Sequence, residues 1–154
     1  MTLLSLLYLW MLALSAGLYF IFSNTILIAL DNLGSEIATT TMRHINRTIQ
    51  NPIFLIIFLG PLLLGGILSW QHLSKNGSQT NSWILLSFLT YFLGVFLITI
   101  FFNVPLNNRL EASKETGYWQ NYKQTWNRFN ILRCLCCLLS LYFLFLLTQF
   151  VKLS

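Results

Sequence analysis

Four long apolar stretches, separated by polar segments, dominate the pattern of this chain. A helix needs roughly 20 residues to cross about 30 Å of hydrocarbon, and each stretch has about that length. Apolar and polar residues do not alternate as they would in the strands of a membrane barrel. The pattern therefore predicts an all-α, integral membrane four-helix bundle that forms a single domain over residues 1–154. The expected spans are residues 3–22, 52–70, 83–102 and 131–151.

Two of the polar segments have helical patterns of their own. In residues 35–50, which follow Gly34, apolar residues recur on one helical face and charged residues lie opposite. This predicts an amphipathic helix that either lies at the membrane interface or is an extension of the second span that caps the bundle. Residues 117–133 are expected to run without a break into the fourth span, so that this helix extends into the cytoplasm. The apolar face comprises Ala38, Met42, Ile45 and Ile49, with Asn46 at its edge.

The composition agrees with a membrane protein. Only 8% of the 154 residues are charged and 56% are hydrophobic, whereas soluble domains have about 25% charged residues. This excludes an ordinary soluble domain. The first stretch has no lysine or arginine ahead of it and no small-x-small cleavage pattern, so it is expected to remain as a span.

The net charge of +5 is distributed unevenly along the chain. Because basic residues favour cytoplasmic loops, we expect both termini outside and the segments 31–51 and 103–130 in the cytoplasm, as in a bacterial inner-membrane protein. Membrane lipid is an expected partner and nucleic acid is not, while nothing in the sequence indicates an oligomeric state. The expected inner side has Arg43, Arg47, Arg109, Lys114, Lys123, Arg128 and Arg133, and the outer side has Lys75 and Lys152.

Polar and aromatic residues share one face of the helix that leads into the fourth span. At about 100° per residue they fall within an arc of roughly 80°. Polar groups near the bilayer boundary are costly unless they have partners, so this face is predicted to form one wall of a site. Alternatively, the aromatic residues form an interfacial belt and the arginine reaches the head groups. The residues are Trp119, Tyr122, Trp126, Asn130 and Arg133.

A proline flanked by two asparagines marks the end of the third span. Pro105 cannot donate to the carbonyl of Phe101, so the helix is expected to kink or stop there. If the chain continues helically, Asn103 and Asn107 share a face. Their carboxamides could then bind a polar group of a ligand, or they could cap the helix end.

Few residues offer other chemistry. His44 and His72 are the only histidines, and neither forms a metal-ligand pattern with a carboxylate, so neither a metal nor a cofactor is expected. The cysteines of the fourth span, at positions 134, 136 and 137, are expected to pack as small apolar residues.

Three motifs recur in the order and spacing of a known family. They are Met42-Arg-His-Ile-Asn46-Arg47 with Asn51-Pro52-Ile-Phe54, then Phe102-Asn103-Val-Pro105-Leu-Asn107, and then Trp119-x-x-Tyr122-x-x-x-Trp126-x-Arg128-x-Asn130-x-x-Arg133. In combination they resemble the anthrone-oxygenase-like family of small four-span membrane proteins. Phe129 departs from the tryptophan-type aromatic that members often have there. The resemblance implies a four-helix membrane fold, and some fungal relatives oxidise anthrones to anthraquinones without metal or flavin.

Two functions stay open at this point. The first is binding of a lipophilic, aromatic or quinone-like molecule at the inner leaflet, without an assigned physiological role. The second is a cofactor-independent membrane oxygenase that acts on an anthrone, phenol or quinol, for which no convincing base stands out. In either case Asn46, Pro105, Trp119, Tyr122 and Trp126 are expected to contact the ligand. Hydrogen bonds to an oxygen anion are expected from Asn103, Asn107, Asn130 and Arg133.

Overall fold

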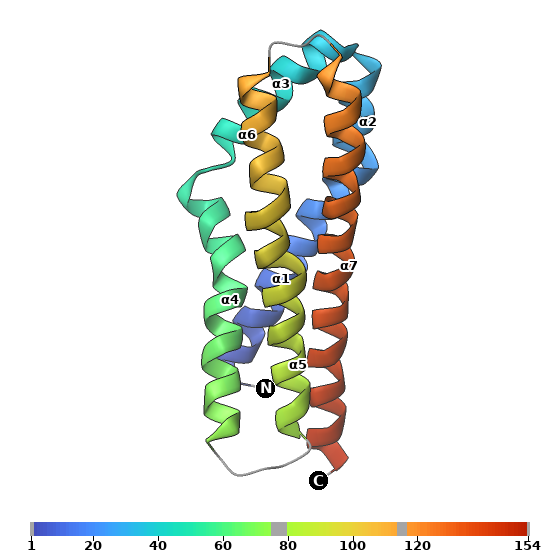
Figure 1. The fold of residues 1–154 in the computed structure, drawn as a ribbon. Coiled ribbons are helices and arrows are strands. Elements are labelled where there is room, and N and C mark those ends of the chain that lie inside the picture. Colours follow the sequence, from blue (N-terminus) through green and yellow to red (C-terminus); the bar gives the residue numbers. More distant parts are fainter. Residues whose placement is uncertain (1, 75–79, 114–116, 154) are drawn as a thin grey trace.

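The computed structural model describes residues 2–74, 80–113 and 117–153, which are helical apart from short connections and contain no strand (Figure 1). Four helical rods in this part of the chain are long and apolar enough to cross a membrane. The all-α integral membrane fold is therefore confirmed. In chain order the elements are α1 (Leu3–Ile21), the π-helical η1 (Phe22–Ile26), α2 (Leu27–Asn32), α3 (Ser35–Thr48), α4 (Pro52–Leu73), α5 (Thr80–Tyr91), the π-helical η2 (Phe92–Leu97) and η3 (Thr99–Asn103), α6 (Val104–Ala112), and α7 (Tyr118–Leu153).

The four rods pack as a ring in which α1 contacts α4 and α7, and α5 contacts α4 and α7. The helix α3 lies across one end of this bundle, and both termini lie at the other end (Figure 1). We call these the α3 end and the terminal end. Many large apolar side chains are exposed on the outside of the ring, as expected where lipid rather than water surrounds the helices.

The rods are longer than the apolar stretches suggested. Most of the extra length lies at the α3 end, and α4 and α5 gain a few residues at the terminal end. They cover Leu3–Asn32, Pro52–Leu73, Ser82–Ala112 and Tyr118–Leu147. The expectation that residues 117–133 run without a break into the fourth span is confirmed by α7, and residues 104–112 are helical as well. The third rod also does not stop at Pro105: the π turn before it lets the Val104 N–H reach the carbonyl of Thr99, and the helix then continues as α6. A widened turn accommodates the missing N–H of a proline without ending the helix.

Close helix contacts hold the terminal-end half together. Ser87 and Ser140 each donate a hydroxyl hydrogen bond to the other's carbonyl, both at 2.9 Å. Gly94 allows α7 to approach η2, because a Cβ at that position would lie 2.3 Å from the sulfur of Cys136. Such contacts between small residues are the usual basis of helix packing in membranes.

Pro61 also requires a partner from another helix. It has no N–H to offer the carbonyl of Ile57, four residues earlier in α4. The hydroxyl of Ser15 on α1 donates to that carbonyl at 3.2 Å. A side chain of one span thus satisfies the backbone acceptor that the proline leaves free in another.

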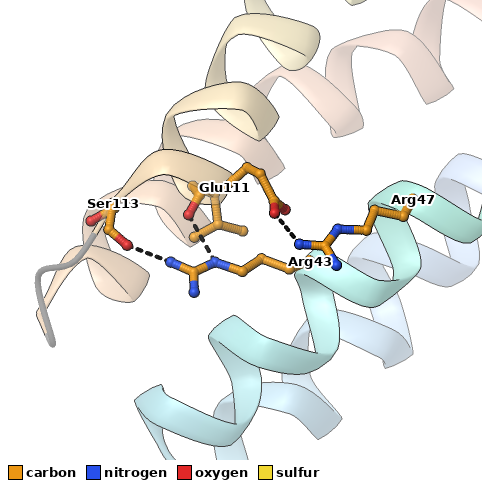
Figure 2. Close-up of polar contacts among 5 residues, drawn as sticks. Arg43, Arg47, Glu111 and Ser113 are labelled. Atoms are coloured by element: carbon orange, nitrogen blue, oxygen red, sulfur yellow. Dashed lines mark hydrogen bonds and ion pairs between the residues drawn. The ribbon is translucent and has the colours of Figure 1, made fainter.

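The amphipathic α3 caps the bundle, with Ala38 and Met42 fully buried beneath it. Gly34, with φ of 86°, makes the turn that leads into it. Figure 2 shows two arginines fixing α3 to the end of α6.

The Arg43 guanidinium donates to the carbonyls of Leu110, at 3.0 Å, and Ser113. Arg47 forms an ion pair with Glu111, which raises the pKa of the Arg47 guanidinium. The last carbonyls of a helix have no partner within it, so Arg43 both caps α6 and holds α3 in place.

Candidate ligand-binding cavity

A cavity of about 390 Å³ lies in the α3-end half of the bundle, between all four rods and beneath α3. Its volume is within the range of about 300–1,000 Å³ that is typical of small-molecule sites. Aromatic rings form much of its wall: Tyr19, Phe22, Phe54, Phe58 and Trp126. The polar lining residues are Asn46, Gln50, Thr99, Asn103, Asn107, Asn130 and Arg133.

Arg133 is buried in this cavity with only 4% of its surface exposed, so it does not reach toward the head groups. Its Nη1 donates to the Thr99 hydroxyl at 3.1 Å and its Nη2 to Oδ1 of Asn130 at 2.8 Å. The guanidinium carbon lies 4.4 Å from the ring centre of Tyr19 and 5.5 Å from that of Trp126. These contacts orient the cation, but no ion pair found among the described residues includes Arg133.

Asn130 links Arg133 to the first rod. Its Nδ2 donates to the carbonyl of Tyr19 at 2.7 Å and to the hydroxyl of Ser23 at 2.6 Å. These acceptors lie where α1 passes into the π-helical η1, and Thr99 begins the π-helical η3. One π-helical segment therefore contacts Arg133 through Thr99, and the other is linked to it through Ser23 and Asn130. Such segments are frequent at functional sites.

Four polar atoms of cavity-lining residues are buried without a hydrogen-bond partner in the described part of the chain. Three are N–H donors, on Asn46 (Nδ2), Trp126 (Nε1) and Arg133 (Nε), and one is an acceptor, Oδ1 of Asn103. Buried polar groups almost always have partners, and each one left unsatisfied costs about 1–3 kcal/mol. Three of these four atoms are donors, so the groups that this part of the cavity wall lacks are hydrogen-bond acceptors.

The two asparagines around Pro105 both line the cavity, whereas Pro105 does not. Nδ2 of Asn103 points to the carbonyl of Trp126 at 3.4 Å. Oδ1 of Asn107 accepts from the hydroxyl of Tyr122 at 2.9 Å. Asn107 thus contributes to the cavity wall while Tyr122, behind it, holds its amide in place.

The expected polar face of α7 divides into two groups. Trp126, Asn130 and Arg133 line the cavity, but Trp119 and Tyr122 do not. Trp119 is fully buried and donates from Nε1 to Oδ1 of Asp31 at 2.9 Å. The ammonium of Lys123 pairs with the same carboxylate at 2.7 Å. Because a helix rises about 1.5 Å per residue, Trp119 lies about 21 Å along α7 from Arg133, too far to share one small ligand.

Sequence reasoning missed the partners of these groups. Tyr19 and Thr99 both line the cavity and contact Arg133. Thr99 precedes Asn103 by one helical turn, so the face shared by the two asparagines could have revealed it. Tyr19 and Ser23 carry hydroxyls in a stretch that reads as plain membrane span, and Asp31 is an isolated carboxylate. No spacing signal marks these three.

A search among protein families matches residues 54–143 to the model described as anthrone oxygenase. This range covers more than half of the chain. The chain belongs to the anthrone oxygenase family. The matched segment includes the cavity residues of η3, α6 and α7. No curated protein and no solved structure matches the chain significantly.

The family match confirms the resemblance drawn from the motifs. It also raises the question of what chemistry the cavity residues can perform. Among the described residues no group of three histidine, cysteine or carboxylate side chains lies together as metal ligands would. What the cavity does hold is a fixed cation, unpartnered donors and aromatic walls.

Proposed function

We propose that this membrane protein binds a flat, lipophilic, oxygen-bearing aromatic or quinone-like molecule in the cavity, at the inner leaflet. The orientation follows from charge, because the described arginines outside the cavity lie toward the α3 end. Lys75 and Lys114, which also entered the charge argument, lie outside the described residues. The α3 end is then cytoplasmic, both termini are outside, and the compartment is a bacterial inner membrane.

The observation that carries the proposal is Arg133. It is a buried cation, in a largely apolar cavity within a membrane, with Nε unpartnered. Burying a charge without an opposite charge is costly. A ligand oxygen with negative or partial negative charge would lower that cost, and the free donors of Asn46 and Trp126 could also reach a ligand. The ring of Trp126 and the other aromatic walls fit a planar molecule.

A binding titration tests this proposal. The protein in lipid nanodiscs is titrated with 2-hydroxyanthraquinone, and binding is followed by quenching of tryptophan fluorescence. A hydrogen bond to a charged group contributes about 1.5–3 kcal/mol, so Arg133→Met should weaken binding about 10- to 100-fold. The control is Arg128→Met, because Arg128 is an exposed arginine on the same helix. Equal affinities of Arg133→Met and the wild type would refute the proposal.

The family match favours one second function, a cofactor-independent oxygenase of the anthrone or quinol type. An anthrone that loses a proton is electron-rich enough to reduce dioxygen directly, and the net products are the anthraquinone and water. The protein would hold the enolate oxygen against Arg133 and the cavity amides, and these preorganised donors would stabilise its charge. Among the described residues that line the cavity there is no histidine and no carboxylate, so the proton would leave through water.

Oxygen uptake distinguishes the two functions. With an anthrone supplied in nanodiscs, the oxygenase predicts uptake that is lost in Arg133→Ala and Asn107→Ala and retained in Arg128→Met. If the wild type binds the hydroxyanthraquinone but consumes no oxygen with an anthrone or quinol, binding alone is the function. Normal uptake in both cavity variants would exclude the cavity as the place of reaction.

A further inference from the structure

Three apolar side chains line the cavity and are nevertheless more than a third exposed, so the cavity is open to the surroundings beside them. They are Leu55 on α4, 44% exposed, Ile100 on η3, 42% exposed, and Val104 at the start of α6, 39% exposed. A residue that faces both the cavity and the surroundings borders an opening. We call the opening between these three residues the lateral mouth.

The packing of the helices accounts for this opening. Within the described residues, α4 packs extensively on α1 and α5, with a smaller contact to η2, and has at most a marginal contact with η3 or α6. Figure 1 shows the first turns of α4 standing apart from α6 at the α3 end. The two sides of the mouth therefore belong to two membrane-spanning rods that diverge there. Exposing Leu55, Ile100 and Val104 is costly in water and not in lipid.

The guanidinium of Arg133 and the amide of Asn130 lie on the far side of the cavity from this mouth, whereas other polar lining residues, such as Asn103 and Asn107, lie on the same rod as the mouth. Arg133 and Asn130 belong to α7, which packs on α1 and α5 and lies across the bundle from α4. A molecule that enters between α4 and α6 meets apolar side chains first and the guanidinium last. Its oxygen must therefore lead, and the part of the molecule opposite that oxygen must follow.

We propose that the ligand enters the cavity sideways from the bilayer through the lateral mouth, with its oxygen-bearing edge first. A hydrocarbon tail on the opposite edge then remains between α4 and α6, in lipid. The site accordingly accepts membrane-dissolved phenols, enols or quinone-like molecules whose tail is far from the recognised oxygen, and rejects isomers with the tail beside it. This inference rests on the binding function proposed above.

A second route is open to test. Gln50, which is exposed, and Asn46 line the cavity where α3 meets α4. A water-soluble ligand would arrive from this side, past polar side chains. Entry through the lateral mouth and entry past Gln50 predict different sensitive residues.

The experiment uses the protein in nanodiscs and two fluorescent isomers, 6-decyl-2-naphthol and 3-decyl-2-naphthol, with unsubstituted 2-naphthol as the reference. Binding kinetics are recorded by stopped-flow mixing. Leu55→Trp and Ile100→Trp narrow the lateral mouth and should slow association of the 6-decyl isomer by at least about tenfold, within the range over which association rates vary among variants. The matched control is Leu63→Trp, because Leu63 is an exposed α4 residue (63%) that does not line the cavity.

The isomers test the orientation of the ligand. The 3-decyl isomer should bind at least about tenfold more weakly than the 6-decyl isomer. Equal affinities of the two decyl isomers would overturn lateral entry. So would slow association in Gln50→Trp together with normal association rates in Leu55→Trp and Ile100→Trp. Binding of 2-naphthol without binding of the 6-decyl isomer would also overturn it and leave the binding function intact. Failure of all three naphthols to bind the wild type would refute both proposals.

Discussion

Replacing Asn130 with leucine, a side chain of similar shape, is the sharpest structural test of the arrangement around Arg133. Asn130 is fully buried. The change removes two hydrogen bonds to the first rod, at 2.7 and 2.6 Å, and the 2.8 Å bond accepted from Arg133. Arg133 keeps its bond to Thr99 but loses its other oxygen partner.

The expected cost follows from these three bonds. Two neutral bonds at about 1 kcal/mol each and one charge-assisted bond at about 2 kcal/mol give about 4 kcal/mol. Hydrogen bonds between membrane helices average nearer 0.6 kcal/mol, which sets a lower value of about 2 kcal/mol. Asn130→Leu should therefore lower the free energy of unfolding by about 2–4 kcal/mol.

The assay is reversible unfolding in mixed detergent micelles, monitored by far-UV circular dichroism. The control is Asn24→Leu, because Asn24 is exposed and its Nδ2 lies 3.5 Å from the Thr25 hydroxyl, so it should change stability by less than about 0.5 kcal/mol. In an Arg133→Met background, the loss of unfolding free energy caused by Asn130→Leu should be smaller than in the wild type by about 1.5 kcal/mol or more, because no cation is then left without its partner. A loss below about 0.5 kcal/mol, or no coupling between the two changes, would refute the reasoning.

Two further predictions concern helix packing and use the same assay. Gly94→Ala would bring its new Cβ to 2.3 Å from a side chain of α7 and should lower the free energy of unfolding by about 1–3 kcal/mol. The control is Gly17→Ala, which should be nearly neutral or stabilising because a Cβ there has nothing within 4 Å. Equal effects of the two substitutions would contradict the close approach of α7 to η2. Ser15→Ala should cost about 1 kcal/mol because the Ile57 carbonyl loses its donor. That cost should largely disappear in a Pro61→Ala background, where the backbone again supplies an N–H, and a cost that persists there would show that Ser15 acts in another way.

Much of the fold could be predicted because lipid allows few solutions. The four apolar stretches had to be helices, since each backbone group must find its partner within its own segment. The amphipathic face of residues 35–50 indicated an interfacial helix or a capping extension of the second span. Burial of Ala38 and Met42 identifies it as a cap, but it is a separate helix that ends before α4 begins at Pro52. The early start of the fourth rod was predicted. The ends of the first and third rods near α3 were missed, because polar residues such as Asp31 and Asn107 are typical of loops, whereas here interhelical contacts keep them helical.

The candidate site was predicted only in part. Helical periodicity grouped Trp126, Asn130 and Arg133 on one face, and the spacing around Pro105 did the same for Asn103 and Asn107; in the structure all five residues line the cavity. Periodicity gives the direction in which a side chain points and not the neighbour that it meets. For this reason it placed Trp119 and Tyr122 in the same wall, although their partners are Asp31 and Asn107.

By itself, the sequence determined the class of the molecule, its four spans and the faces on which polar residues lie, because these depend on hydrophobicity and on the repeat of a single helix. The tertiary structure decided that Tyr19 and Thr99 surround Arg133, that Ser15 serves the carbonyl left free by Pro61, and that α4 diverges from α6. These depend on how far each rod slides and tilts against its neighbours. The relative position and tilt of two rods are fixed by packing between them, and the spacing of residues within one helix does not predict either.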